Sequence, residues 1–432
     1  MAKIYLLSLG CDKNRVDGET MVGALRAKGY EVINNPEQAA VIIINTCGFI
    51  KDAVQESIDT IFELAEYKKS GACRALVIVG CMAERYKDEI KETIPEADAF
   101  VGVGEYEKIA AIIERLVGKP ENTAKNVGLP RLMARDDSDV PHIAYVKISD
   151  GCDNHCAYCT IPAIRGAYKA RPSQEILDEC RLLVEAGAVE LVLVAQDTAR
   201  YENLPQLLRD IAATSGAKWI RLMYAYPEHI TPSLISALAE IPQMCKYLDM
   251  PIQHSEASVL SRMGRRGARR ELEQLIRVLR DRVPGIALRT TVMVGFPGET
   301  AEDFKNLCDF VQEMKFDRMG AFPYSQEEGT RAALMPDQIS DEIKQKRLNK
   351  IMQLQQKIHF KKQRKYVGKT LSVIVDGCVQ GEYIGRTQYD AYEADAVVSF
   401  SSVVPLAVGQ ICDVRISDTV DYDLVGCVGL HE

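Results

Sequence analysis

The chain has 432 residues, a formal net charge of −8 and near-average fractions of apolar (47%) and charged (26%) residues. These values predict a globular protein of two to four domains and argue against a disordered chain. No apolar run reaches the roughly 18–20 residues of a membrane span, and the start lacks a secretory signal, so we expect a cytoplasmic protein with no membrane partner. The thirteen cysteines would then stay reduced, which leaves metal binding, catalysis or core packing as their roles.

Residues 1–120 alternate short, almost entirely apolar β-rich runs with helical patterns. This order predicts a doubly wound α/β domain with a parallel sheet. Cys11, Cys47 and Cys81 each stand just after one of the β-rich runs. The carboxyl ends of parallel strands share one edge of a sheet, and ligands bind at that edge. We therefore expect these three cysteines to meet at one site; the alternative is three buried core thiols.

A polar stretch over residues 119–141 has the composition of a linker, and a second domain is expected over residues 138–336. Six β-rich runs alternate there with helical stretches, which predicts a barrel or a partial β/α barrel. Each run ends in a polar cluster, among them SDGCDNHC and GFPGE. Enzymes with β/α barrels build their sites from these carboxyl-end loops, so we expect the chemistry of this domain there.

The last part of the chain changes character twice. Residues 337–367 predict a long, basic linking helix, which we interpret as a solvated bridge. Residues 368–432 contain short strand patterns broken by Gly, Asp and Pro, which predict a small β-barrel. Lys369, Arg386 and Arg415 stand against ten carboxylates in this tail, a balance of −7.

The stretch GCDNHCAYCTIP, residues 151–162, places three cysteines at the spacing C-x3-C-x2-C. Three thiolates do not complete a tetrahedral zinc site, although His155 is available as a fourth ligand. Three cysteines can also hold three irons of a four-iron cubane cluster. The fourth iron of such a cluster stays open, so a substrate or cofactor can bind to it.

This loop, with Tyr158 before its last cysteine, resembles that of the radical S-adenosylmethionine (SAM) enzymes. Together with SLGCDKNRVDGE, NTCGF, VGCMAER and the terminal β-barrel, it makes nearly the whole chain similar to the methylthiotransferase family. The resemblance implies a partial β/α barrel of the radical SAM type, a TRAM-like terminal barrel, two 4Fe-4S clusters and SAM. It also implies the metal ligands, which are Cys11, Cys47, Cys81, Cys152, Cys156 and Cys159. The other cysteines are interpreted as packing residues; they are Cys73, Cys180, Cys245, Cys308, Cys378, Cys412 and Cys427.

The resemblance also suggests residues that bind SAM. The stretch VGFPGE, which includes Gly295 and Glu299, lies where radical SAM barrels contact the adenosyl part of the cofactor. Other strand-end side chains could bind the methionyl amine or the ribose hydroxyls. The alternative for each is an ordinary polar loop residue. His229 and His254 are interpreted as structural, and no catalytic side chain is assigned. The expected cofactor contacts are Tyr158, Gln196, Asp197, Gln253, Gly295 and Glu299.

The chemistry implied by the resemblance is the reductive cleavage of SAM, hydrogen abstraction from an unactivated carbon and delivery of a methylated sulfur. The family modifies either an adenosine of transfer RNA or an aspartate of small-subunit ribosomal protein twelve. The stretch YLDMPIQHS and the acidic tail favour the ribosomal-protein branch, because an RNA-binding barrel is expected to be basic. Five arginines between Arg262 and Arg270 argue for RNA, unless they form a solvated helix face.

The expected partners are ribosomal protein S-twelve or the small ribosomal subunit, and an electron donor such as a flavodoxin or a ferredoxin. The sulfur donor remains unknown. A different class of function is an iron–sulfur scaffold or electron carrier. Such a protein would not need a barrel rim of polar loops, and it would not release 5′-deoxyadenosine from SAM.

Overall fold

The computed structural model describes residues 2–87, 89–119 and 141–429, so most of the expected linker over residues 119–141 lies outside the described residues. Contacts between residues divide the chain into two compact units. The amino-terminal unit contains residues up to 119 together with residues 149–169 and 327–330. The carboxyl-terminal unit contains residues 141–148, 170–326 and 331–429. The domain boundaries expected from the sequence remain a prediction.

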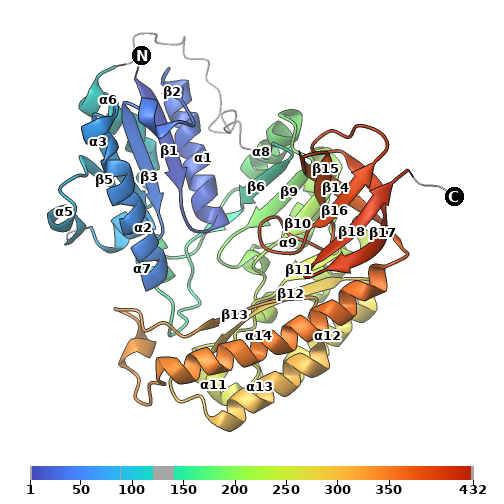
Figure 1. The fold of residues 1–432 in the computed structure, drawn as a ribbon. Helices are drawn as coiled ribbons and strands as arrows, with labels where there is room; N and C mark the ends of the chain where they lie inside the picture. Colours follow the sequence, from blue (N-terminus) through green and yellow to red (C-terminus); the bar gives the residue numbers. More distant parts are fainter. Residues whose placement is uncertain (1, 88, 120–140, 430–432) are drawn as a thin grey trace. The chain divides into compact units, whose positions relative to one another are not determined.

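The amino-terminal unit is built on a parallel sheet with the order β2-β1-β3-β4-β5 (Figure 1). β3 and β4 are buried along their whole length, because helices cover both faces of the sheet. This confirms the doubly wound fold, and the short strands β2 and β5 are additions to it. The elements are β1 (Lys3–Ser8), α1 (Asp12–Ala27), β2 (Glu31–Val32), β3 (Val41–Thr46), α2 (Lys51–Ala65), α3 (Tyr67–Ser70), β4 (Ala75–Gly80), α4 (Cys81–Arg85), α5 (Glu89–Thr93), β5 (Ala99–Val101), α6 (Ile109–Val117), β7 (Ser149–Asp150) and α7 (Ile161–Arg165).

The carboxyl-terminal unit contains the expected partial β/α barrel. Its parallel strands form two runs, β6-β9-β10 and β11-β12-β13. A parallel bridge between Ile220 and Met244 joins the two runs. The elements are β6 (Ile143–Lys147), α8 (Ser173–Glu185), β9 (Glu190–Val194), α9 (Leu204–Thr214), β10 (Trp219–Leu222), α10 (Pro232–Glu240), β11 (Tyr247–Asp249), α11 (Ala257–Arg262), α12 (Arg269–Arg282), β12 (Ala287–Val294), α13 (Ala301–Met314) and β13 (Arg318–Pro323).

The long basic helix is α14 (Asp341–Gln363), and it is not the solvated bridge that the sequence suggested. It runs along β13 and α13, in orange in Figure 1. Ile351 is fully buried in the barrel core, and Gln355 and His359 on the same face are buried too. The polar character of this face concealed its burial. Gln355 Nε2 donates to the backbone carbonyl of Phe316, and His359 Nε2 bonds to that of Tyr422.

The tail closes into a small barrel with the strand order β14-β15-β16-β18-β17, as expected. Its core is aliphatic with one central phenylalanine, Phe400. The strands are β14 (Thr370–Val379), β15 (Glu382–Thr387), β16 (Val398–Ser402), β17 (Ile411–Val420) and β18 (Asp423–Val428), of which β18 was not predicted.

Charged residues fill the amino-terminal ends of the barrel strands, where residues 386–395 of the tail meet them. Glu190, at the start of β9, lies 2.6 Å from Arg221 of β10 and 2.9 Å from Arg386 of β15. Arg386 also pairs with Asp376 of β14 at 2.7 Å. The neighbouring strands repeat the pattern, because Arg318 of β13 pairs with a tail carboxylate, that of Asp390. We call this set of buried ion pairs the basal charge layer.

Candidate metal centre

The three amino-terminal cysteines lie at one edge of the sheet. Cys11 follows β1 and precedes α1, Cys47 follows β3, and Cys81 is the first residue of α4 after β4. Since β1, β3 and β4 are neighbours in a parallel sheet, their carboxyl ends meet. Gly10 has a φ of +88°, and a Cβ there would lie 3.0 Å from the Cys47 sulfur. The missing side chain therefore lets the Cys11 and Cys47 loops approach each other.

The charges of these thiols would influence one another. Burial raises the pKa of Cys47, and a charge on Cys11 adds to the increase. Burial also raises the pKa of Cys81 to about 11, an effect that the positive charge of Arg165 partly offsets. Iron deprotonates the thiols that it binds, so metal rather than local charge would supply the thiolate state here.

The second set of cysteines lies in the loop between β7 and α7, in the same unit. Cys152 and Cys156 are buried, and burial raises the pKa of Cys159 to about 12. Backbone N–H groups point at two of the sulfurs: Asn154 N lies 3.5 Å from the Cys152 sulfur and Ile161 N lies 3.4 Å from that of Cys159. Such donors stabilise thiolates, and they favour a bound metal.

Contacts join the segments that carry the two sets. The Thr160 hydroxyl, next to Cys159, donates to the backbone carbonyl of Phe49 at 3.3 Å. Arg165, the last residue of α7, reaches the Cys81 sulfur at 3.4 Å. Within the described residues, no three His, Cys, Asp or Glu side chains surround a single-ion site. A cubane cluster binds each cysteine to a different iron, so it suits ligands that are spaced more widely than those of zinc.

The residues expected to bind SAM fall on strand ends of the carboxyl-terminal unit, except Tyr158, which is buried in the cysteine loop. Gln196 follows β9 and Gln253 follows β11. The side-chain oxygen of each is buried without a hydrogen-bond partner among the described residues. Buried acceptors are rarely left unsatisfied, and a ligand with amine or hydroxyl donors would satisfy both.

Two of the expected SAM contacts have partners within the protein. The Asp197 carboxylate bonds to His229 Nδ1 at 2.6 Å and accepts from Tyr226 N at 3.2 Å. The hydrogen bond that His229 donates to Asp197 raises the pKa of His229. The Glu299 carboxylate accepts from the backbone N–H of Gly295 at 2.6 Å, so it shapes the turn that begins at Gly295.

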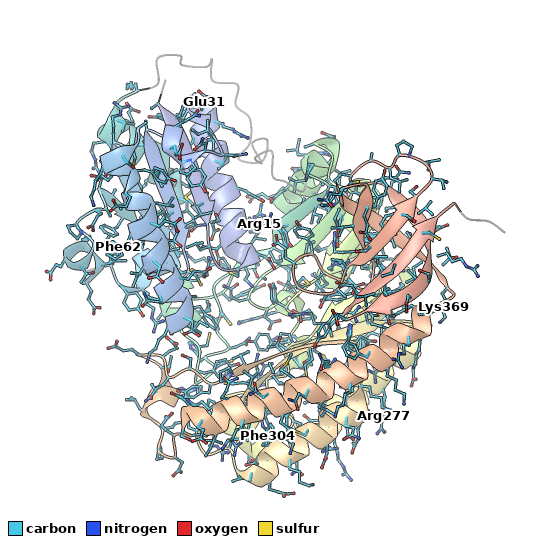
Figure 2. All side chains as sticks on the ribbon, viewed as in Figure 1. Arg15, Glu31, Phe62, Arg277, Phe304 and Lys369 are labelled. Atoms are coloured by element: carbon cyan, nitrogen blue, oxygen red, sulfur yellow. The ribbon has the colours of Figure 1, made fainter. Side chains whose placement is uncertain are left out.

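Helix α14 supports this turn from outside, which the sequence did not indicate. Arg347 donates to the Glu299 carboxylate at 2.8 Å and to its backbone carbonyl at 3.1 Å. The stem of Lys344 packs directly against Gly295. The guanidinium of Arg347 also lies 5.5 Å from the ring centre of Phe304, a residue of α13 that lies beside α14 in Figure 2. No local sequence signal could have identified this contact, because Arg347 and Glu299 are 48 positions apart.

His254 is fully buried between this turn and the next helix. Burial lowers its pKa to about 3, so the imidazole is neutral. Its Nδ1 accepts from Glu256 N at 3.0 Å, which leaves the proton on Nε2. Nε2 lies 4.0 Å from the Glu299 carboxylate and has no hydrogen-bond partner among the described residues, so the structural interpretation of this histidine stays a prediction.

The cysteines outside the two sets were expected to pack in cores. Cys73, Cys180, Cys245 and Cys308 are buried, as expected, and Cys412 and Cys427 are half-buried. Cys378 is exposed near the end of β14, so the packing interpretation is wrong for it. No helix among the described residues is long and apolar enough to cross a membrane.

Comparisons with known proteins cover most of the chain. Residues 3–102 match the Uncharacterized protein family UPF0004, residues 146–311 match the Radical SAM superfamily, and residues 367–428 match the TRAM domain. The chain is 45% identical to the ribosomal protein uS12 methylthiotransferase RimO of Clostridioides difficile (strain 630), with 99% of each chain covered. It is 44% identical to the protein of the same name from Geobacter sulfurreducens, with 98% of each covered.

Solved structures share the fold at low identity. The radical S-adenosylmethionine methyltransferase TsrM from Kitasatospora setae, with cobalamin and a 4Fe-4S cluster bound, has a TM-score of 0.57 at 16% identity and 75% coverage of each chain. The cobalamin-dependent S-adenosylmethionine radical enzyme OxsB has a TM-score of 0.53 at 14% identity, over 83% of this chain and 56% of its own. These likenesses confirm the radical SAM type of barrel.

Proposed function

Because the chain belongs to the ribosomal protein uS12 methylthiotransferase (RimO) family, we propose that it adds a methylthio group to the β-carbon of an aspartate in uS12. It is a radical SAM transferase whose relatives match it over almost its full length. The observation that carries the proposal is the presence of two cysteine sets on contacting segments of one unit. One set alone would suit simpler radical SAM chemistry.

We assign the ligands as the sequence suggested. Cys152, Cys156 and Cys159 would hold the cluster that binds SAM, and the trio of Cys11, Cys47 and Cys81 would hold the second cluster. When bound, the clusters and SAM supply the electron, the radical chemistry and the methylated sulfur. The protein residues bind and orient SAM and exclude water. Gln196 and Gln253 offer buried acceptors, and Glu299 with Arg347 fixes the turn at Gly295.

Charge supports a protein substrate over transfer RNA. Arg386 and the carboxylates of Asp376 and Asp390 neutralise one another or the barrel within the basal charge layer, and the remaining carboxylates of the tail still outnumber Lys369 and Arg415. An acidic barrel repels phosphates and attracts a basic ribosomal protein.

The arginines between Arg262 and Arg270 are also largely engaged within the protein. Arg262 donates to the carbonyl of Gly298 at 2.8 Å, and Arg269 pairs with Glu313 at 2.6 Å. Arg265 stacks on the Tyr226 ring, 4.1 Å from its centre. These contacts weaken the argument for a transfer RNA substrate.

The reaction also needs partners. We propose the cytoplasm as its location and a flavodoxin or ferredoxin as the donor, because a 4Fe-4S centre takes one electron at low potential. The sulfur donor stays unassigned.

In the test, the protein is reconstituted anaerobically and reduced in the presence of SAM. It is then given uS12 in one reaction and unmodified transfer RNA in another. Mass spectrometry should find a methylthio group on an aspartate of uS12 and none on the RNA. Cys81→Ala should abolish this product, whereas Cys378→Ala, a change at an exposed cysteine outside both sets, should not. Modification of the RNA alone would favour the transfer RNA alternative, and absence of both products with intact clusters would favour an electron carrier.

A further inference from the structure

Arg165 is a buried cation at the point where the two cysteine sets meet. Its side chain is 1% exposed and stands at the end of α7, six positions after Cys159. One of its terminal nitrogens, Nη2, lies 3.4 Å from the Cys81 sulfur and 2.9 Å from the carboxylate of Asp17. The other, Nη1, lies 3.2 Å from each carboxylate oxygen of Asp150. One guanidinium therefore contacts the sulfur of one candidate ligand, Cys81. It also contacts residues of the segments that carry Cys11 and Cys152.

The partners of Arg165 come from every part of the candidate centre. Asp17 lies on α1, the helix that begins after Cys11, and Asp150 lies two positions before Cys152. Asp150 also accepts from the backbone N–H of Gly151 at 2.9 Å, which holds the start of the cysteine loop. Removing a buried guanidinium from such a set leaves charges unpaired.

The contact with Cys81 sets Arg165 apart from the other buried arginines. In the basal charge layer, Arg221 and Arg386 are paired with carboxylates. Arg165 has carboxylates on two sides and directs part of its donor capacity at a sulfur. A hydrogen bond and a positive charge beside a ligand sulfur stabilise the more negative, reduced state of an iron–sulfur cluster.

We propose that Arg165 is a positioning residue that raises the reduction potential of the cluster held by Cys11, Cys47 and Cys81. This inference rests on the proposed function, because it takes that cluster as given. The step concerned is the uptake of one electron by the cluster from an external reductant, in which no bond forms or breaks. Asp17 opposes the effect, because its carboxylate places a negative charge next to the same guanidinium.

The experiment is an anaerobic redox titration of the full-length chain, with dithionite as reductant and electron paramagnetic resonance as readout. Cys152, Cys156 and Cys159 are replaced by alanine in every sample so that only the amino-terminal cluster is titrated. Iron and sulfide analysis comes first. A sample with wild-type Arg165 that binds no iron contradicts the proposed function, and unchanged potentials in iron-loaded variants contradict the present inference.

Arg165→Gln should lower the equilibrium constant for one-electron reduction by about tenfold, which is about 59 mV. Arg165→Lys keeps the charge without the forked geometry, so it should restore part of the loss. Asp17→Asn removes the opposing charge, so it should shift the potential in the positive direction. A merely structural role would not give opposite signs for Arg165→Gln and Asp17→Asn.

The matched control is Arg85→Gln. Arg85 is on the same helix as Cys81 and is paired with Glu327 at 3.1 Å, but it donates to the carbonyl of Gly48 and not to a sulfur. Its loss should leave the potential unchanged. An equal shift in Arg85→Gln overturns the proposal, as does a shift of the same sign in Asp17→Asn. If Arg165→Gln binds no iron, the shifts in reduction potential of the other two variants test the proposal. Arg165→Lys should shift the potential in the negative direction and Asp17→Asn in the positive direction, and shifts of the same sign overturn the proposal.

Discussion

Both ends of the barrel strands carry buried polar groups, but the two ends differ in whether these groups have partners within the protein. At the amino-terminal ends, Glu190 and Arg386 are buried and paired with opposite charges. At the carboxyl-terminal ends, Gln196 and Gln253 keep buried oxygen atoms that have no partner among the described residues. Buried charges that are paired with opposite charges contribute to one fixed structure, whereas neutral buried acceptors with no partner indicate a place for a ligand. Changes at the two ends should therefore separate stability from cofactor binding.

The largest effect is expected in the basal charge layer. Arg386→Met leaves Glu190 and Asp376 without one of their cations, and breaking a buried pair in this way costs about 3–5 kcal/mol. Urea denaturation followed by circular dichroism measures the loss. The affinity for SAM, measured by calorimetry below the unfolding transition, should stay unchanged. A lower affinity at equal folding would show that the two ends are coupled.

The same layer should make stability depend on acid pH. Burial alone would raise the pKa of Glu190, but Arg221 and Arg386 hold it at about 2, below the value of 4.5 for a free side chain. The carboxylate thus contributes stability that is present above pH 4.5 and is lost as the pH falls towards 2, in total about 3 kcal/mol. Urea titrations between pH 6 and pH 3 should show this loss in the wild type. A parallel pH dependence in Glu190→Gln would contradict it.

At the other end, Gln253→Leu removes an unsatisfied acceptor and should leave stability unchanged or slightly higher. If the oxygen accepts a hydrogen bond from SAM, the affinity for SAM should fall about tenfold, or about 1.4 kcal/mol. Calorimetry with SAM and urea denaturation of the same sample measure both quantities. A stability loss with unchanged affinity would assign Gln253 to the core instead.

The smallest effect is expected from a change on α14, which supports the turn at Gly295 from outside the barrel. Arg347→Ala frees the Glu299 carboxylate and should raise the KM for SAM a few-fold, about 1 kcal/mol, with a smaller change in kcat. Arg277→Ala on α12 is the control, because its side chain is 71% exposed and pairs with Glu273 of the same helix rather than with this turn. Equal effects of the two changes would exclude a positioning role for Arg347.

The sequence predicted those features that depend on neighbouring residues. β3 and β4 were recognisable because every side chain in them is buried, which makes each an unbroken apolar run. The meeting of the amino-terminal cysteines followed from the parallel order of the strands before them. β5 has three residues, so it is too short to give a clear pattern.

The features that the sequence did not predict depend on contacts between distant residues. Arg165 bonds to Asp17 across 148 positions, and Arg347 bonds to Glu299 across 48. No local pattern distinguishes such an arginine from a surface residue. The sequence did not predict the burial of one face of α14 for a related reason. Gln355 and His359 bond to backbone carbonyls that are 39 and 63 positions away in the chain.

The basal charge layer also affects how the molecule can be divided for experiments. A protein truncated before β14 would lack Asp376, Arg386 and Asp390. It would expose the buried pair of Glu190 and Arg221 and would leave Arg318 without the carboxylate of Asp390. Such a fragment would lose activity through misfolding even if the tail had no part in recognising the substrate. Point substitutions on the outer surface of the tail are therefore the sound way to map its binding role, because they leave the basal charge layer intact.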